Sequence, residues 1–446
     1  MTVIRELEHK RESLVRRWKE ISKTNKDMTE DIVKRNIVGI IGTSEDWKIQ
    51  LSDFLRKINL PITDSSTEES ITVNGERVKV NLDLRGIDLS NERFTARRFN
   101  EFAYARNTAK HSSSIGDMSG LHFEYAVLDN THFEGIDISN SCFDFSSLQN
   151  CIFKHSKCIN DSFIGADCCK ILFENADLNE SAFIFSDMRG AEIVASEIEG
   201  CDFTGAKFFQ AKLVSNSCDV STKFISEKVY YIKDNEYTIL SIRGKEILID
   251  SEKTPVCVLR ENLDEDDRRW RTTKRYAMVL DEYNEKNDED DWSEIKEIYR
   301  QIKLMYRSHG FYSEGDTYFF LELKAKRKSH ASVIYRSFMK AIEFLTGYGI
   351  KIERMVILAL TTVGFFSCIY AFDSSNLVSS DSVMNMSFKE LISRSIYFSI
   401  VTFTTVGYGD IHPIGYMRFV ANFEAFCGLL VMGLFVVSIT RKFIGD

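Results

Sequence analysis

The chain has 446 residues, a length that favours two or three domains, and its formal net charge is −9. Residues 116–216 contain sixteen acidic and six basic residues, a local charge of −10, so the rest of the chain is close to neutral. This balance excludes a generally basic, nucleic-acid-binding chain, and we expect no nucleic acid among its partners.

The ten cysteines are expected to be reduced thiols, because Met1–Glu20 is charged throughout and does not read as a secretory signal. No Cys-x-x-Cys pair is present, which argues against a metal site. The sequence also contains no nucleotide-binding glycine loop and no nucleophile elbow, so we expect neither an enzyme nor a resident cofactor. Small apolar cysteines fall on core positions of the repeat described below: Cys151, Cys158, Cys168 and Cys201.

Residues 1–70 are predicted to form an N-terminal helical region, with Leu14, Trp18 and Ile21 on one side of a helix. Within the next stretch, Ile71–Val80 indicates a hairpin with Asn74-Gly75 as its turn.

A period of five residues dominates 71–220. A large central residue recurs at each fifth position, from Leu84 to Phe99 and, after a break near residues 105–115 that shifts the frame by one, from Met118 to Leu213. Neither a helix nor a strand has this period, whereas a square coil with five residues per side does. The pattern resembles the pentapeptide-repeat family over residues 82–216, which implies a right-handed quadrilateral β-helix with coils about 4.8 Å apart. We expect the frame shift to mark a loop or bulge.

Residues 221–292 are predicted to be a strand-containing region with acidic linkers, since 228–259 alternates like short strands. The runs Asp264–Asp267 and Glu285–Asp291 lack the glycine and the alternate ligand spacing of a calcium loop, so we interpret them as solvated linkers.

Residues 293–350 are predicted to contain a helical hairpin and a pre-membrane helix. The hairpin, over 293–323, resembles one tetratricopeptide-like unit. The segment Val333–Leu345 indicates an amphipathic helix that either lies on the inner membrane surface or packs on the cytosolic domain. Basic residues that suit anionic lipid precede it: Lys324, Lys326, Arg327 and Lys328.

Residues 351–446 are predicted to be a pore domain with two membrane spans, 352–372 and 419–441. Met355–Phe372 has no charge and Phe419–Thr440 has one, Glu424, and both are long enough to cross a bilayer. Lys351 and Arg354 precede the first span, and Arg441 and Lys442 follow the second. We therefore expect a multi-pass protein of the plasma (inner) membrane with both termini in the cytoplasm.

Between the spans lies an apolar helix, 391–403, that is too short to cross a bilayer and is followed by a conspicuous run, 404–410. Irregular backbone at membrane depth is tolerated only inside protein or along a water-filled path. The negative end of the short helix would favour a cation. We therefore expect a re-entrant pore helix followed by an ion filter.

The pattern Ser399-x-x-Thr402-x-Thr404-Thr405-Val406-Gly407-Tyr408-Gly409-Asp410-x-x-Pro413 resembles the pore of two-transmembrane prokaryotic potassium channels, over about residues 340–443. The resemblance implies a homotetramer in the lipid bilayer, with potassium as the permeant ion. It assigns the potassium-binding filter to Thr405, Val406, Gly407, Tyr408 and Gly409. Support of the filter is assigned to Thr404 and Asp410.

The chain departs from that family behind the filter. Val401 stands where some members have a glutamate, and Tyr397 and Phe398 stand where tryptophans are frequent, so we expect these positions to affect filter stability more than selectivity. Glu424 is expected to face protein behind the filter, bonding a pore-helix hydroxyl, because a charge facing lipid is costly.

Gly428 lies where the family has a hinge glycine, and the sequence leaves a hinge and a packing glycine equally open. On the same face follow Met432, Val436 and Thr440, which are predicted to line the inner pore.

No arginine ladder is present, and Gly347-Tyr348-Gly349, which no Thr-Val precedes, is interpreted as an elbow into the membrane. The sequence ends six residues after Thr440, from which we expect no gating domain behind the pore. Gating is expected to come from the N-terminal cytosolic domain, through an unknown ligand or protein regulator. The alternative function is a membrane-anchored interaction scaffold, similar to acidic pentapeptide-repeat proteins that mimic DNA.

Overall fold

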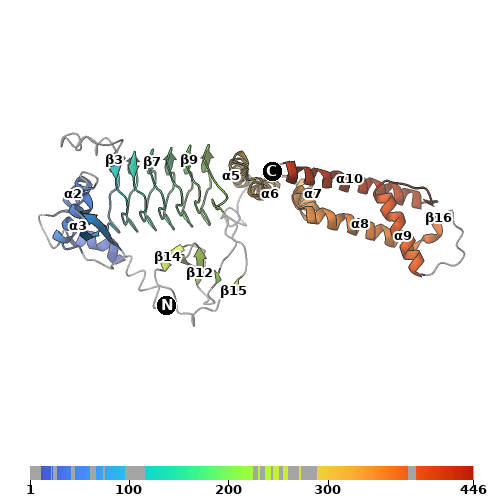
Figure 1. Ribbon diagram of the computed structural model, residues 1–446, viewed down its shortest axis with the longest axis horizontal. Coiled ribbons are helices and arrows are strands. Elements are labelled where there is room, and N and C mark those ends of the chain that lie inside the picture. The colour runs from blue at the N-terminus through green and yellow to red at the C-terminus, as the bar shows by residue number, and fades with distance from the viewer. Residues whose placement is uncertain are drawn as a thin grey trace. The chain divides into compact units, whose positions relative to one another are not determined.

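The computed structural model describes residues 12–21, 23, 28–41, 46–60, 67–73, 76–95, 116–224, 230–231, 237–242, 245–250, 255–259, 271–272, 289–379 and 388–444. The chain forms two compact units, Met1–His309 and Gly310–Asp446 (Figure 1). Four predicted features lie wholly or partly outside the described residues: the Asn74-Gly75 turn, Phe99, the Asp264–Asp267 run and Glu285–Asp288 of the second acidic run. The last three residues of that run, Glu289–Asp291, belong to a helix and not to a linker.

In the described part of the N-terminal region, helical segments are followed by a hairpin. Residues 12–21 are helical, and α2 (Glu30–Ile40) and α3 (Trp47–Lys57) follow. Thr29 caps α2 by accepting a hydrogen bond from the backbone N–H of Ile32. The hairpin consists of β1 (Glu68–Val73) and β2 (Glu76–Asn81), so it begins before the boundary expected at residue 71.

The repeat folds into a β-helix, as its period predicted. One side of the coils forms a parallel sheet of β3 (Arg93–Thr95), β5 (His132–Glu134), β7 (Ile152–Lys154), β8 (Leu172–Glu174), β9 (Glu192–Val194) and β10 (Lys212–Val214). From β5 onward, paired residues are twenty apart in sequence, for example Phe133, Phe153 and Phe173, which is four sides of five. The phenylalanine rings stack inside the coil, with Phe163 and Phe183 4.6 Å apart between centroids.

The frame shift marks an insertion inside the first coil. Phe94 pairs with Phe133, which is 39 residues away instead of twenty. The fourth side of this coil is supplied by β4 (Gly116–Asp117), which pairs with β6 (Ile136–Asp137), and the buried Met118 follows it. Met118 therefore occupies the place that the pattern gave to Phe99, and residues 96–115 interrupt the coil between its third and fourth sides. An insertion at a corner leaves the pairing on both sides intact.

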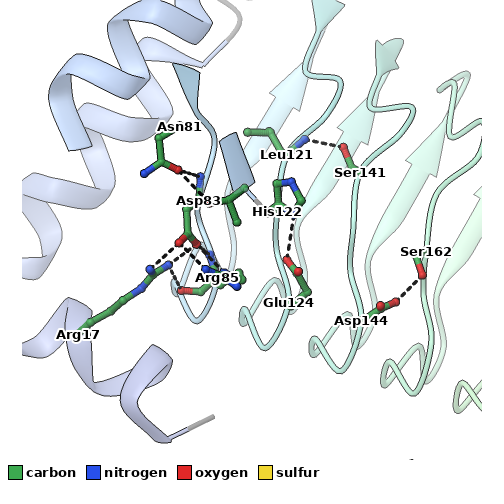
Figure 2. A network of polar contacts seen from close by, with 11 residues as sticks. Arg17, Asn81, Asp83, Arg85, Leu121, His122, Glu124, Ser141, Asp144 and Ser162 are labelled. Atoms are coloured by element: carbon green, nitrogen blue, oxygen red, sulfur yellow. Dashed lines mark hydrogen bonds and ion pairs between the residues drawn. The ribbon is translucent and has the colours of Figure 1, made fainter. Parts of the chain in front are cut away.

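A buried ion-pair cluster attaches the N-terminal helix to the first coil (Figure 2). Arg17 donates to Asp83 at 2.6 and 2.8 Å, and Arg85 donates to the same carboxylate at 2.8 and 2.9 Å. The indole of Trp18 donates to the carbonyl oxygen of Arg85 at 2.7 Å. Burial alone would raise the pKa of Asp83, but the hydrogen bonds from Arg17 and Arg85 lower this pKa to about 2. The cluster thus closes the N-terminal end of the solenoid with a buried carboxylate that two guanidinium groups pair.

Helix α5 (Glu289–Ser308) closes the other end of the solenoid, where it packs on β10 (Figure 1). Its Tyr306 hydroxyl donates to the carbonyl oxygen of Thr222 at 2.6 Å, and its Gln301 accepts from the backbone N–H of Leu213 at 2.8 Å. Both helices of the hairpin predicted over 293–323 are present, with α5 in the solenoid unit and α6 (Tyr312–Lys328) in the other unit. The apolar face of α5 packs on the end of the solenoid.

The solenoid extends to Phe224, beyond the expected boundary at residue 220, since this ring stacks on Phe203 at 4.8 Å. Short strands follow, as the alternating pattern indicated. They are β11 (Tyr230–Tyr231), β12 (Tyr237–Ile242), β13 (Lys245–Asp250), β14 (Pro255–Leu259) and β15 (Arg271–Thr272), with β12, β13 and β14 in one antiparallel sheet.

The second unit is mainly helical. After α6 come α7 (Val333–Thr346), η4 (Gly347–Gly349), α8 (Ile352–Phe372), η5 (Ser374–Asn376), β16 (Leu377–Ser379), α9 (Phe388–Phe403), β17 (Ile411–Pro413) and α10 (Met417–Ile444). Helix α9 begins three residues before the expected start at Leu391, and α10 is longer at both ends than the expected span.

Helices α8 and α10 have the composition of membrane spans. Both have a mean hydropathy of 2.1 over their most apolar window, and only 22% of each window is buried within the chain. The core helix of a soluble protein of this hydropathy would be largely buried, so the exposed apolar surface indicates a membrane protein.

Candidate functional site

Helix α9, the predicted pore helix, ends in a backbone motif that leads directly into the predicted filter. The backbone N–H of Val406 donates to the carbonyl oxygen of Val401, and that of Thr405 donates to Thr402, both at 3.0 Å. Thr405 has a φ of 57°, in the left-handed region. These are the two hydrogen bonds and the residue conformation of a Schellman motif, with a threonine where glycine is usual. Thr404 also contributes, because its hydroxyl donates to the carbonyl oxygen of Ile400 at 2.7 Å.

The backbone of the filter run alternates in handedness. Thr405, Gly407 and Gly409 have φ values of 57°, 58° and 79°, whereas Val406 and Tyr408 have negative φ. Alternation between mirror-image conformations is what allows successive peptide carbonyls to face one side of a chain. Two of the three left-handed positions are glycine, which adopts that region without a Cβ penalty. The side chains of Val406 and Tyr408 are exposed on the single chain.

Asp410 is attached to α9 by a tyrosine. The Tyr397 hydroxyl donates to Oδ2 of Asp410 at 2.8 Å. Val401, where a carboxylate brace was expected to be missing, is buried and cannot supply one. Phe398 is also buried, and its ring meets the edge of Tyr370 at 4.8 Å. Tyr397 therefore connects Asp410 to α9 by a hydrogen bond.

Glu424 of α10 is hydrogen-bonded to residues of α8 and α9. Its side chain is fully buried; one carboxyl oxygen is hydrogen-bonded to the Ser399 hydroxyl of the pore helix, and the other accepts from the Tyr370 hydroxyl at 2.7 Å. The predicted bond to a pore-helix hydroxyl is confirmed. Tyr370 was missed, although a tyrosine hydroxyl in an apolar span signals a need for a polar partner.

Gly428 lies where α10 crosses the end of α9. A Cβ at this position would overlap the carbonyl oxygen of Phe403, the last residue of the pore helix. The structure thus shows a packing reason for glycine here, whereas the hinge stays a prediction. Gly433, five residues further along α10, has nothing within 4 Å of its Cβ position.

Three further α10 residues, Met432, Val436 and Thr440, are all exposed on the single chain. They recur at intervals of four and so share one helix face. Their role as inner-pore residues stays a prediction. The second Gly-Tyr-Gly, at 347–349, forms η4 between α7 and α8, with Tyr348 at a φ of 58°.

The end of the unit that contains the predicted filter run is held together by residues that sequence reasoning did not single out. Strand β16 pairs with β17, just after the filter run. The Tyr416 hydroxyl donates to Asp373, and this bond lowers the pKa of Asp373 and raises that of Tyr416. The backbone N–H of Ile414 donates to Asn376 at 2.9 Å. The segment after the filter is therefore tied to the end of α8.

Comparisons with known proteins agree with this division of the chain. Residues 355–444 match the model of the ion channel family, and residues 117–154 match that of the pentapeptide repeats, in eight copies. A search of curated proteins finds no match. Two similar solved structures concern the solenoid. The pentapeptide repeat protein Rfr23 from the cyanobacterium Cyanothece 51142 is 16% identical, covering 32% of this chain and 87% of that chain, with a TM-score of 0.20. A pentapeptide repeat protein from the thylakoid lumen of Arabidopsis thaliana is 22% identical, covering 23% and 63%, with a TM-score of 0.17.

Proposed function

From the fusion of a pentapeptide-repeat solenoid to an ion-channel domain, we propose that the protein conducts potassium selectively and that its N-terminal part controls conduction. The observation that carries the selectivity is the run Thr405–Gly409 with its alternating φ values. Rings of backbone carbonyls in this sequence can replace the hydration shell of K⁺. The carbonyls of Thr405, Val406, Gly407 and Tyr408 are the proposed ligands.

The proposed assembly is a homotetramer. One chain can contribute only one side of each ion cage, and the filter residues of the single chain are exposed. Large apolar side chains of α10 are also exposed, among them Phe423, Phe426 and Leu429. Neighbouring subunits and lipid would cover these surfaces, which water would otherwise meet.

The proposed orientation has α7 on the inner membrane surface. Its face with Ile334, Phe338 and Phe344 is exposed, and the exposure of Ile334 is 84%. The opposite side is polar and packs on the protein, where Glu343 pairs with Arg327 of α6 at 3.0 Å. Because α7 leads into α8 through the short η4, its free apolar face favours the membrane surface over packing on the cytosolic domain. Both termini would then be cytoplasmic.

The proposed route of control passes through Glu343. Its carboxylate pairs with Arg327 and accepts from the Tyr348 hydroxyl at 3.3 Å, and its backbone carbonyl accepts from Arg354 of α8 at 2.8 Å. Burial first, and then the nearby Glu343, raises the pKa of Tyr348 to about 12, so this hydroxyl stays a donor at physiological pH. These bonds join α6, the elbow and the first span, so a movement of α6 would reach the pore.

Potassium uptake into liposomes that contain the purified chain tests the proposal. The wild type should take up K⁺ and largely reject Na⁺, whereas Gly407→Ala should take up neither, since a Cβ strains the left-handed backbone at this position. Size-exclusion chromatography in detergent should show the same tetramer for both. Equal K⁺ and Na⁺ uptake by the wild type would refute potassium selectivity.

A further inference from the structure

The surroundings of the Glu424 carboxyl group bear on its protonation state. Tyr370 from α8, Ser399 from α9 and Glu424 from α10 are all fully buried. Within the described part of the chain, the hydrogen bonds of Glu424 go to these two hydroxyls, and no lysine, arginine or histidine pairs with it. An ionised carboxylate that is buried without a cation is strongly disfavoured in a membrane interior.

The hydrogen bonds around Ser399 also favour a protonated Glu424. Its Oγ lies next to two acceptors, the Glu424 carboxyl group and the carbonyl oxygen of Val363 at 3.0 Å. A serine hydroxyl has one proton, and an ionised carboxylate has none to give. If Glu424 is protonated, it donates to Ser399, and Ser399 donates to Val363. The Tyr370 hydroxyl then donates to the remaining carboxyl oxygen, and every contact has one donor.

The position of this network relates it to the filter. Ser399 and Phe403 are four residues apart on α9, and Glu424 and Gly428 are four residues apart on α10, so each pair lies on one helix face. The first pair meets the second in two places, at the Ser399–Glu424 bond and at the Phe403–Gly428 packing contact. Phe403 is followed by the filter run. The two contacts therefore fix the position and tilt of α9 relative to α10, and with them the position of the filter run that follows α9.

We propose that Glu424 is a neutral carboxylic acid in the folded pore and acts as a positioning residue that fixes the pore helix between α8 and α10. The inference rests on the proposed channel function. It gives Glu424 a role that needs its hydrogen-bonding shape and not its charge. Glutamine has the same shape, and it can donate to Ser399 and accept from Tyr370.

Four variants test this inference in planar bilayers. Glu424→Gln should keep the K⁺/Na⁺ permeability ratio and the current stability of the wild type. Glu424→Ala and Ser399→Ala should lose current roughly tenfold faster at constant voltage, because they leave buried groups unpaired. The double variant Glu424→Ala/Ser399→Ala should be no worse than Glu424→Ala alone, as expected for partners in one network.

Infrared difference spectroscopy of wild type against Glu424→Gln supplies a readout that does not need conduction. A protonated carboxyl band that is lost in Glu424→Gln supports the inference, whereas a carboxylate band overturns it. Glu424→Gln that behaves like Glu424→Ala in the bilayer also overturns it. A wild type without K⁺ selectivity would refute the proposed function instead, and the infrared result would still decide the protonation state.

Discussion

The hydroxyl of Tyr397 donates a hydrogen bond of 2.8 Å to Asp410, which joins the pore helix to the residue that follows the filter glycine. The removal of this donor in Tyr397→Phe should make the filter lose its conducting form roughly tenfold faster, about the effect of one hydrogen bond to a charged group. Current decay in planar bilayers measures it. Tyr397→Trp, which keeps an N–H donor, is the matched control. A Tyr397→Phe current as stable as that of the wild type would show that the bond does not support the filter.

Gly428→Ala should weaken the pore unit, because its Cβ would overlap the carbonyl oxygen of Phe403. Overpacking of this kind costs about 1–3 kcal/mol. The temperature at which the detergent-solubilised tetramer dissociates should fall. Gly433→Ala is the control, since its Cβ has free space and alanine favours a helix by about 1 kcal/mol. An unchanged temperature for Gly428→Ala together with a changed open probability would favour the hinge.

Glu343→Ala should disconnect α6 from the first span, since Glu343 bonds Arg327 and Tyr348. We expect a changed open probability with an unchanged K⁺/Na⁺ permeability ratio, measured on single channels. Glu353→Ala, at an exposed position at the start of α8, should match the wild type. If the open probability of Glu343→Ala is also that of the wild type, this route of control is wrong.

Asp161→Ser should stabilise the solenoid. Asp161 occupies the inner position that Ser141 and Ser181 occupy in the neighbouring coils, and its Oδ2 has no hydrogen-bond partner among the described residues. Burial first, and then the nearby Asp137, raises the pKa of Asp161 well above its ordinary value. The unpaired oxygen costs about 1–3 kcal/mol, which serine avoids.

The pH dependence of this gain has a definite sign. A raised pKa means that the folded state favours the protonated acid, so the penalty in the wild type grows as the pH rises above about 4. The advantage of Asp161→Ser in thermal unfolding should therefore be larger at pH 7 than at pH 4. An advantage that is equal at both values would show that Asp161 is not desolvated.

The contribution of Asp83 to stability has the opposite pH dependence. Its pKa of about 2 lies below the ordinary value of 3.8, so its contribution is present above pH 4 and is lost as the pH falls toward 2. Asp83→Asn should destabilise the first coil by about 3–5 kcal/mol, because Arg17 and Arg85 stay buried without a counter-charge. Hydrogen exchange over residues 82–94 of the full chain measures it. The control, Asp88→Asn, removes an exposed carboxylate and should have little effect.

The sequence predicted those features that depend on local pattern. The five-residue period predicted the coil, and the length and low charge of two apolar runs predicted α8 and α10. Both signals extend over many residues, which makes them strong. The Ser399–Glu424 bond was predictable because a buried carboxyl group needs a polar partner. What could not be predicted depends on tertiary contact. Met118 completes the first coil although twenty residues intervene, α5 packs on the end of the solenoid, and Gly428 meets Phe403.

The zero-current potential of a bilayer with K⁺ on one side and Na⁺ on the other tests potassium selectivity most directly. With equal concentrations on the two sides, the purified wild-type chain should give a large potential that is negative on the K⁺ side, as expected for a carbonyl-lined filter at Thr405–Tyr408 that passes K⁺ far better than Na⁺. A potential near zero, which means equal permeability for K⁺ and Na⁺, would contradict it.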